Sequence, residues 1–282
     1  MNSISLFWYS YPNEIPNIGD YLGKFIVQNM SEEKVTYTDI ATNVPKYATI
    51  GSIINQNVGE NTTFWGSGIK SEKWVPPSHS KYLAVRGPLT YRLLCKNGIH
   101  CHKIFGDPAL LLPFILEKPN KSKSYKIGII PHYFDEKYVR EEFENDGIED
   151  VTIISCITDD VGAFVEKICQ CEFIVSSSLH GMIISHAYGI PALWMRFSED
   201  DRIGSSSSFK FHDYFLSCGI ELYTPPVINP IKDYQKVLKI IKDHAYLMSI
   251  NNFNALPLIE SCPFLDLSKI DSLKSKAVSY AW

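Results

Sequence analysis

Short apolar runs alternate with helix-length amphipathic segments along this chain, and this alternation constrains the fold more than any single motif does. Apolar runs of strand length lie at residues 3–9, 81–85, 101–105, 126–130 and 173–175. Strands separated by helices are typical of parallel sheets whose two faces are covered by helices. The sequence therefore predicts an α/β fold with mainly parallel sheets.

A polar, charged segment broken by Pro119 interrupts this alternation at residues 117–124. The alternation then starts again, so we interpret the segment as a linker between two α/β units. We predict an N-terminal Rossmann-like domain at residues 1–117 and a C-terminal one at residues 118–282, facing each other across an active cleft. The helical segments from residue 228 onward are expected to close the C-terminal domain, and the last of them to reach back over the N-terminal one.

Charge and hydropathy exclude two classes of protein. The 282 residues include 27 Lys and Arg against 31 Asp and Glu, which gives a formal net charge of −4. A broad nucleic-acid-binding surface needs a basic field, so we expect no nucleic-acid partner. No apolar stretch approaches the roughly 18 residues of a transmembrane helix. The first 16 residues lack the basic and apolar parts of a signal peptide, so we expect a cytoplasmic protein.

Cysteine usage fits that compartment, because the chain has seven cysteines, an odd number, and they are scattered. Several lie in apolar stretches, where a free thiol packs as a small hydrophobic group. One residue separates Cys169 from Cys171, whereas common zinc and redox motifs have two. A zinc site made of Cys101, His102 and this pair is the weaker interpretation, so no metal site is predicted.

Polar residues after predicted strands are the candidates for chemistry, because ligands of open α/β sheets bind at the carboxyl ends of the strands. Asn17-Ile18-Gly19-Asp20 follows the first strand. Its glycine permits close backbone approach, and its aspartate is either a base or a plain helix cap. Gly66-Ser67-Gly68 follows a later strand, where small residues leave room for a ligand and expose N–H groups to an anion.

Arg86 lies between a predicted strand and a predicted helix, in the motif Arg86-Gly87-Pro88-Leu89-Thr90. No neighbour in the sequence supplies a carboxylate, so this arginine is a candidate for binding a phosphate or a carboxylate of a ligand. Asp107, in Gly106-Asp107-Pro108, follows a further strand, and we interpret it as a helix cap.

The segment Ser176-Ser177-Ser178-Leu179-His180-Gly181 follows a buried strand and leads into a predicted helix. Three hydroxyls beside a helix N-terminus predict a phosphate cradle. His180 is either a proton donor to a phosphorylated substrate or a capping or core histidine, and both interpretations stay open. His132 ends the neighbouring strand and is a weaker candidate of the same kind. The four serines at residues 205–208 predict a mobile loop near the cleft.

The motifs named above follow one another along the chain, and Ala109-Leu110-Leu111 comes directly after Asp107-Pro108. As an ordered set they resemble the polysaccharide pyruvyl transferases. The resemblance runs from the first strand to Met195. It implies a two-domain fold similar to that of the GT-B glycosyltransferases. It also implies phosphoenolpyruvate as donor and, as acceptor, a sugar of a cell-surface polysaccharide or of its lipid-linked precursor. The product would be a pyruvate ketal bridging two hydroxyls, with phosphate released and no metal or cofactor needed.

The resemblance also assigns roles to matching residues. Arg86 would hold the phosphate or carboxylate of the donor, His180 would lie at the donor site, and Asp20 would help to deprotonate an acceptor hydroxyl. Many members of the family have an arginine where this chain has Ser178, and we expect Lys210 to supply the missing charge. The remaining residues expected to bind substrate are Asn17, Gly19, Gly66, Ser67, Gly68, His132, Ser176, Ser177, Ser178 and Gly181.

Two other functions stay open. A GT-B glycosyltransferase that uses a nucleotide sugar would need groups for the base and ribose, and Glu199-Asp200 can be interpreted in that way. A non-catalytic protein that binds a glycan or a sugar phosphate could keep the same fold. A nicotinamide dehydrogenase is disfavoured, because Gly19 and Gly23 do not form the glycine-rich fingerprint after the first strand. A lipid-linked acceptor would bring the protein to the inner face of the membrane.

Overall fold

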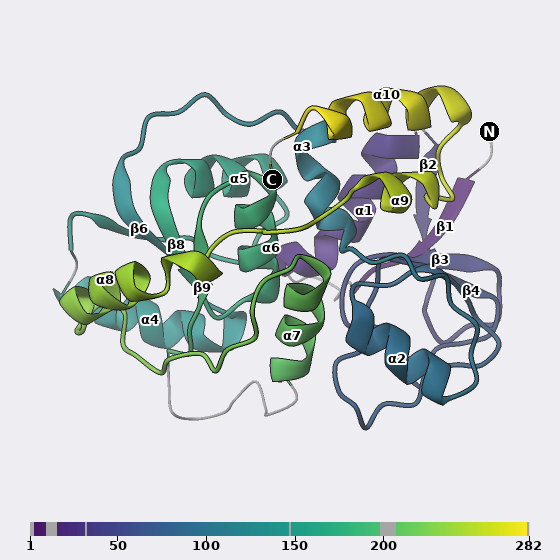
Figure 1. Cartoon of the computed structure of the whole chain (residues 1–282), viewed down its shortest axis with the longest axis horizontal. Coiled ribbons are helices and arrows are strands. Elements are labelled where there is room, and N and C mark those ends of the chain that lie inside the picture. The colour runs from purple at the N-terminus through teal and green to yellow at the C-terminus, as the bar shows by residue number, and fades with distance from the viewer. Residues whose placement is uncertain (1–2, 10–15, 32, 147, 198–206, 281) are drawn as a thin grey trace.

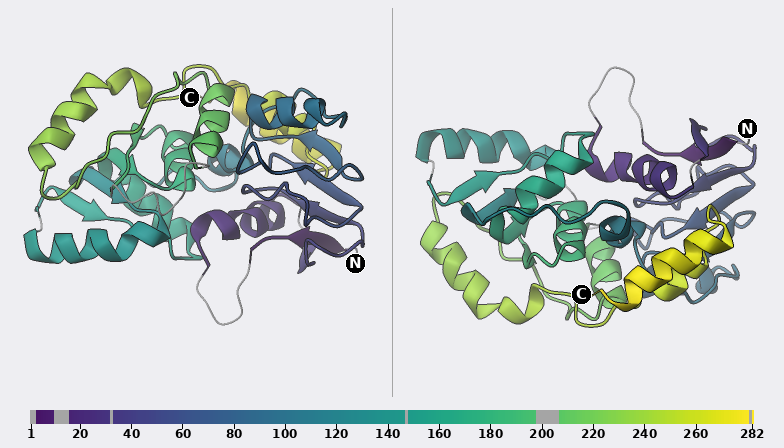
Figure 2. Two further views of the ribbon diagram at one scale, coloured as in Figure 1. Left: turned by 90° about the horizontal axis from the view of Figure 1, so that it is seen from below. Right: turned by 90° about the horizontal axis from the view of Figure 1, so that it is seen from above.

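The computed structural model describes residues 3–9, 16–31, 33–146, 148–197, 207–280 and 282 (Figure 1). Two parallel sheets, one from each half of the chain, lie at opposite ends of the long axis, with α1 (Ile18–Ser31) and α6 (Leu179–Ala187) between them (Figure 2). The prediction of an α/β fold with parallel sheets is therefore confirmed. The paired sheets also agree with the GT-B-like arrangement that the resemblance implied.

The N-terminal sheet has the strand order β2-β1-β3-β4-β5, and every neighbouring pair is parallel. Helix α1 covers it with an apolar stripe, in which Ile18, Leu22 and Ile26 recur every four residues and are fully buried. The strands and the second helix are β1 (Ser3–Phe7), β2 (Lys34–Tyr37), β3 (Lys46–Ala48), β4 (Thr62–Trp65), β5 (Lys81–Ala84) and α2 (Pro88–Lys96).

The C-terminal sheet has the order β7-β6-β8-β9 and is parallel throughout. Its central strand β8 (Cys171–Ser176) buries Ile174 and Val175 completely, as expected for a strand covered on both faces. The other elements of this half are β6 (Tyr125–Ile130), α4 (Tyr133–Asp146), β7 (Val151–Ile153), α5 (Val161–Cys169), β9 (Ala192–Trp194), α7 (Ser207–Ser217), α8 (Tyr234–Asp243) and the short turn η2 (Ala245–Leu247).

One predicted strand is wrong. Residues 101–105 form no strand, and only an isolated bridge joins Phe105 to Val85. The chain turns directly afterwards into the short helical turn η1 (Pro108–Leu111) and into α3 (Leu112–Ile115). The extended run is therefore used as a connection and stops at Gly106, whose φ is +148°.

The two halves share one hydrophobic core. Leu110 and Phe114 from the connecting turns pack in the same cluster as Leu22 of α1 and Met182 of α6. The start of α1 is also tied to the C-terminal half, because the N–H of Ile18 donates to the carbonyl of Cys156 at 2.7 Å. This shared core fixes the starts of α1 and α6 relative to each other.

The last helices, α9 (Leu256–Glu260) and α10 (Leu267–Val278), lie over the N-terminal half (Figures 1 and 2). Trp65 of β4 donates its indole N–H to the carbonyl of Leu258 at 3.0 Å. Lys276 of α10 donates to the carbonyl of Phe114 at 2.8 Å. The end of the chain thus braces the N-terminal sheet and the connection between the halves. Within the described residues, each helix is too short or too polar to span a bilayer.

Candidate active site

A cavity of about 270 Å³ opens at the junction of the two halves. Its walls come from loops at the carboxyl ends of the strands and from the starts of α1 and α6, which is where ligands bind in folds of this class. The lining residues are Tyr9, Asn17, Asp20, Gly51, Ser52, Lys70 and Trp74 from the N-terminal half and His132, Tyr133, Ser178, Leu179, His180 and Lys210 from the C-terminal half.

Helix α6 begins at this cavity. Ser178 caps it, with its Oγ accepting the N–H of Gly181 at 3.5 Å, and the next residues, Leu179 and His180, line the cavity wall. A helix N-terminus carries partial positive charge and unpaired N–H groups. The start of α6 therefore favours an anionic ligand.

The other two serines of the predicted phosphate cradle do not reach the cavity. Ser176 is fully buried and donates to the carbonyl of Ile130 at 2.8 Å. Ser177 is 1% exposed and donates to Asp135 at 2.6 Å. Both hydroxyls satisfy buried groups beneath the sheet edge, so the prediction of a three-serine cradle is corrected to a single lining serine, Ser178.

His180 faces a buried carboxylate. Its Nε2 lies 3.7 Å from Oδ2 of Asp107, which is fully buried, and neither atom has a hydrogen-bond partner among the described residues. The other oxygen of Asp107 caps η1 by accepting the N–H of Ala109 at 3.0 Å. The helix-cap interpretation of Asp107 was therefore incomplete, because one carboxylate oxygen caps a turn while the other faces the histidine.

Gly19 makes room for His180. A Cβ at this position would lie 2.0 Å from Nδ1 of the imidazole. Asn17 holds the same turn by accepting the N–H of Gly19 at 2.9 Å, and Asp20 follows at the cavity wall. The motif around Gly19 therefore places the imidazole and a carboxylate side by side.

Asp20 has a perturbed carboxyl group. Burial raises its pKa to about 6, although the nearby His180 and Lys210 act in the opposite direction. A carboxyl with this pKa is mostly ionised at neutral pH and can still accept and return a proton. Such a value is typical of a general base rather than of a plain helix cap.

Lys210 extends from α7 into the cavity, where Lys70 also lies. Burial, together with the charges of Arg86 and Lys70, lowers the pKa of Lys210 to about 8. The site thus gathers two lysines in the same cavity as Ser178. Lys70 gave no signal in the sequence, because it lies in an irregular loop beyond β4.

His132 lines the cavity as a neutral ring. Burial and the neighbouring Lys210 and Lys70 lower its pKa to about 3. Its backbone N–H donates to Oγ of Ser177 at 2.8 Å, which fixes the loop after β6. His132 can therefore contribute a neutral hydrogen bond to a ligand, whereas the charge of the site comes from the lysines.

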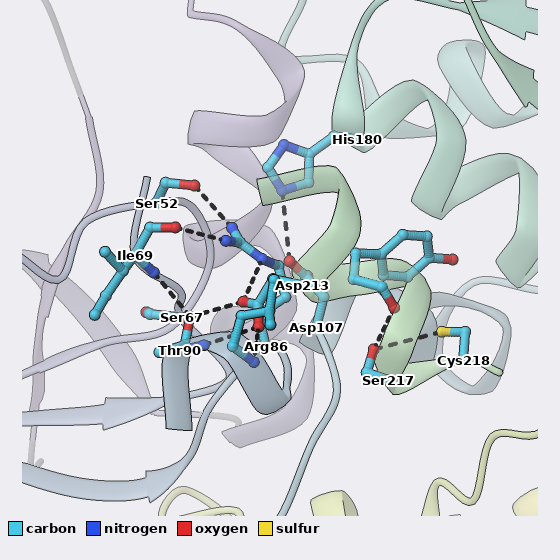
Figure 3. A network of polar contacts seen from close by, with 12 residues as sticks. Ser52, Ser67, Ile69, Arg86, Thr90, Asp107, His180, Asp213, Ser217 and Cys218 are labelled. Atoms are coloured by element: carbon cyan, nitrogen blue, oxygen red, sulfur yellow. Dashed lines mark hydrogen bonds and ion pairs between the residues drawn. The ribbon is translucent and has the colours of Figure 1, made fainter. Parts of the chain in front are cut away.

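Arg86 does not line the cavity, which corrects the prediction that it contacts the donor. Its side chain is fully buried, with Nη1 donating to Oγ of Ser52 at 2.7 Å and Nη2 donating to the carbonyl of Ile69 at 2.9 Å (Figure 3). Its Nε forms an ion pair of 3.3 Å with Asp213 of α7, whose side chain is also fully buried. The missing carboxylate is thus supplied by a residue distant in sequence.

Asp213 also caps α2. Gly87, the N-cap residue, has no side chain for this purpose, so the N–H groups of Leu89 and Thr90 donate to Oδ1 of Asp213 at 2.9 and 3.0 Å. Thr90 Oγ1 donates to the second oxygen at 2.7 Å. The network in Figure 3 therefore ties α7, which carries Lys210, to the N-terminal half.

The glycine-rich turn after β4 lies behind the cavity wall. Ser67 is fully buried and donates to the carbonyl of Thr49 at 2.8 Å. A Cβ on Gly68 would lie 2.3 Å from the guanidinium carbon of Arg86. The predicted ligand contacts of Gly66, Ser67 and Gly68 are thus replaced by packing roles, and Gly181 is likewise buried beneath the wall.

The described residues contain no group of three or more His, Cys, Asp and Glu placed to hold a metal ion. Glu199-Asp200 lie outside the described residues, as do the first two of the four serines. The lining residues that lie outside the predicted set of site residues are Tyr9, Gly51, Ser52, Lys70, Trp74, Tyr133 and Leu179. Of these, Gly51 and Ser52 follow the end of β3, so their position after a strand could have identified them as candidates.

The architecture is that of an α/β protein with two parallel sheets and a lysine-bearing cavity at their junction. The chain belongs to the polysaccharide pyruvyl transferase family, whose profile matches residues 17–199. An uncharacterised protein of Acanthamoeba polyphaga mimivirus is 31% identical over 267 residues, which cover 93% of this chain and 88% of that protein.

The succinoglycan biosynthesis protein ExoV of Rhizobium meliloti is 30% identical over 139 residues, which cover 49% of this chain and 40% of that protein. Among solved structures, two variants of the wall teichoic acid polymerase TagF are similar with a TM-score of 0.46 each, at 10% and 8% identity. Each of these matches covers 98% of this chain and 90% of the TagF chain.

Proposed function

We propose that this protein transfers the pyruvyl group of phosphoenolpyruvate to two hydroxyls of one sugar, forming a ketal and releasing phosphate. The acceptor is a sugar of a cell-surface polysaccharide or of its lipid-linked precursor, which would bring the protein to the inner face of the membrane. Family membership supports the class of reaction. The observation that carries the proposal is the convergence of Lys70, Lys210 and the start of α6 on one cavity.

The size and charge of the cavity support this donor. Its volume of about 270 Å³ lies just below the range of about 300–1,000 Å³ that is usual for pockets holding drug-sized ligands. Phosphoenolpyruvate is small and carries a phosphate and a carboxylate, so two lysines and a helix N-terminus complement both groups. A nucleotide sugar would need further space for its base and ribose.

The cavity wall also contains side chains suited to binding the acceptor sugar. The aromatic residues Tyr9, Trp74 and Tyr133 lie in the cavity wall. Aromatic faces stack on the apolar faces of sugar rings while their polar edges stay hydrogen-bonded. Asp20 lies in the same wall, so a stacked sugar would present its hydroxyls to a carboxylate with a pKa of about 6.

The chemistry follows from these groups. In the first step the protonated ring of His180, which the carboxylate of Asp107 stabilises, donates a proton to C3 of the donor and makes C2 electrophilic. A sugar hydroxyl then forms the first C–O bond at C2, and Asp20 takes its proton. In the second step another hydroxyl attacks C2, and the bond from C2 to the phosphate oxygen breaks. The departing phosphate takes the second hydroxyl proton while Lys70 and Lys210 stabilise its charge, and the proton on Asp20 returns to His180.

Release of phosphate from phosphoenolpyruvate tests the proposal. The purified protein would be assayed alone and with galactosides, glucosides and mannosides, and the product examined by NMR for the methyl group and quaternary carbon of a ketal. We expect acceptor-dependent release in the wild type, none in His180→Ala, and unchanged release in His102→Ala, which alters an exposed histidine outside this cavity.

Two results would contradict the proposal. Consumption of a nucleotide sugar with no phosphate released from phosphoenolpyruvate would identify a glycosyltransferase. Binding of phosphoenolpyruvate without turnover, whatever acceptor is supplied, would identify a binding protein.

A further inference from the structure

Ser52 occupies a particular place in the cavity wall. It follows β3 at the carboxyl end of the strand and lines the cavity with a half-buried side chain. Behind it lies Arg86, which is fully buried and donates from Nη1 to Oγ of Ser52 at 2.7 Å (Figure 3). This contact decides what the serine hydroxyl can offer to a ligand.

A hydroxyl has one proton to donate, and a guanidinium can only donate. Arg86 therefore occupies an acceptor position on Oγ of Ser52 and cannot receive its proton. Among the described residues no group accepts a hydrogen bond from Ser52, whereas the buried Ser67 beside it donates to Thr49. The proton of Ser52 is thus left for whatever occupies the cavity.

The guanidinium that sets this direction is held from three sides. Besides Ser52, it donates to the carbonyl of Ile69 and pairs with Asp213. It cannot turn into the cavity without leaving Asp213 buried and unpaired, which is costly. Its positive charge polarises the hydroxyl that it contacts, because hydrogen bonds in a chain strengthen one another.

The surrounding wall shows which ligand chemistry this donor suits. The two lysines, Lys70 and Lys210, and the first turn of α6 all present hydrogen-bond donors to the same cavity. Phosphate and carboxylate oxygens are acceptors only, so they satisfy such a set without leaving a donor unpaired. A sugar hydroxyl also has a proton to donate, so it would need a hydrogen-bond acceptor, and none of the groups named here is one.

We propose that Ser52 is a substrate-binding residue that donates its hydroxyl proton to an anionic oxygen of the donor, and that Arg86 is the positioning residue that fixes this direction. The inference rests on the proposed function, because it takes the cavity to hold an anionic donor. It also gives Arg86 a role in donor binding that needs no direct contact with the ligand.

The test compares Ser52→Ala with two matched variants. Ser52→Thr keeps the hydroxyl. Thr90→Val removes the bond from Thr90 Oγ1 to Asp213, and so loosens the same network while leaving Ser52 intact. The readouts are the KM for phosphoenolpyruvate, kcat, the KM for the acceptor, and the Kd of inorganic phosphate measured by calorimetry.

Loss of one hydrogen bond to a charged group predicts a rise of about 10- to 100-fold in the KM for phosphoenolpyruvate and in the phosphate Kd of Ser52→Ala. The acceptor KM should stay within about twofold, Ser52→Thr should restore most of the affinity, and Thr90→Val should lower Tm with little change in either constant. A Ser52→Ala protein with wild-type constants would overturn the proposal, and so would an equal loss of affinity in Thr90→Val.

The phosphate Kd separates this inference from the proposed function. If the wild type binds phosphate but transfers no pyruvyl group, the function fails, and the effect of Ser52→Ala on phosphate binding still decides the role of this serine. If the wild type binds neither phosphoenolpyruvate nor phosphate, both proposals fail.

Discussion

Oδ2 of Asp107 lies 3.7 Å from Nε2 of His180, across the junction of the two halves, and both atoms are buried without another hydrogen-bond partner among the described residues. Two buried polar atoms that face each other without a hydrogen bond carry a desolvation cost. A small shift that brings the two atoms within hydrogen-bond distance would remove this cost. We infer that the pair closes to a hydrogen bond when substrate fills the cavity. Asp107 would then orient the imidazole and stabilise its protonated form.

Asp107→Asn tests this role. The variant keeps an oxygen for the cap on Ala109, but it can place an amide N–H opposite Nε2, which disfavours the protonated ring. We expect kcat to fall by roughly 10²-fold, in the range that a positioned acid contributes, while the KM for phosphoenolpyruvate and Tm change little. Steady-state kinetics and a thermal melt check this. Unchanged kcat would show that His180 works without its carboxylate.

Gly19→Ala tests the close contact on the other edge of the ring. The added Cβ would lie 2.0 Å from Nδ1 of His180, so the imidazole or the start of α1 must move. We expect a loss of kcat of at least about tenfold and a lower Tm, in keeping with the cost of overpacking. Gly162→Ala is the control, because its Cβ would meet the nearest atom at an ordinary 3.5 Å and alanine favours the helix. Equal activity in the two variants would contradict the assignment.

Much of the site was predictable because strand ends are recognisable in the sequence. Asp20, Ser178 and His180 lie where a strand is followed by the start of a helix, and the structure gathers them in one cavity. Parallel sheets bring such positions to the same edge, whatever their separation in the chain. The α/β class was predictable for the same reason, since continuous apolar strands separated by helices leave few other folds.

The role of Arg86 was not predictable, because its counter-ion lies on α7, far along the chain. A search for a carboxylate near in sequence could not find Asp213. The predicted ligand contacts of Ser176 and Ser177 were wrong for a related reason. A serine hydroxyl at the end of a strand can face the ligand or bond to a buried group, and the residue type alone does not distinguish these two arrangements. Lys70 and Trp74 lie in a loop without a regular pattern, so only the three-dimensional arrangement places them at the cavity.

Arg86→Ala should therefore destabilise the protein as well as weaken donor binding. It leaves Asp213 buried without its cation, and breaking a buried pair typically costs about 3–5 kcal/mol. We expect the free energy of unfolding in urea to fall by about that amount in Arg86→Ala and in Asp213→Ala. The double variant should lose less than the sum of the two, because the residues interact directly. Strictly additive losses would show that the ion pair contributes nothing.

The pH dependence of transfer tests the assignments of Asp20 and Lys210 together. Asp20 accepts a proton only when ionised, and its pKa is raised to about 6 by burial, so kcat/KM should rise with pH through about 6. Lys210 binds the donor as a cation, and its pKa is lowered to about 8, so kcat/KM should fall above about 8. The profile is a bell with its maximum between these values. Lys210→Arg should move the falling limb to higher pH, because arginine keeps its charge.

Stability gives an independent check on Asp20. Its pKa is higher in the folded chain than the ordinary value of 3.8, so the folded state favours the protonated carboxyl and loses this advantage as pH rises from about 4 through 6. Asp20→Asn should therefore be more stable than the wild type at pH 7.5, by about 3 kcal/mol, and equally stable near pH 3.5. Transfer by the same variant should be lost at every pH. Urea unfolding at the two pH values measures this difference. A variant less stable than the wild type at pH 7.5 would contradict the assignment, because it would mean that the neighbouring cations stabilise the ionised carboxylate in the folded state.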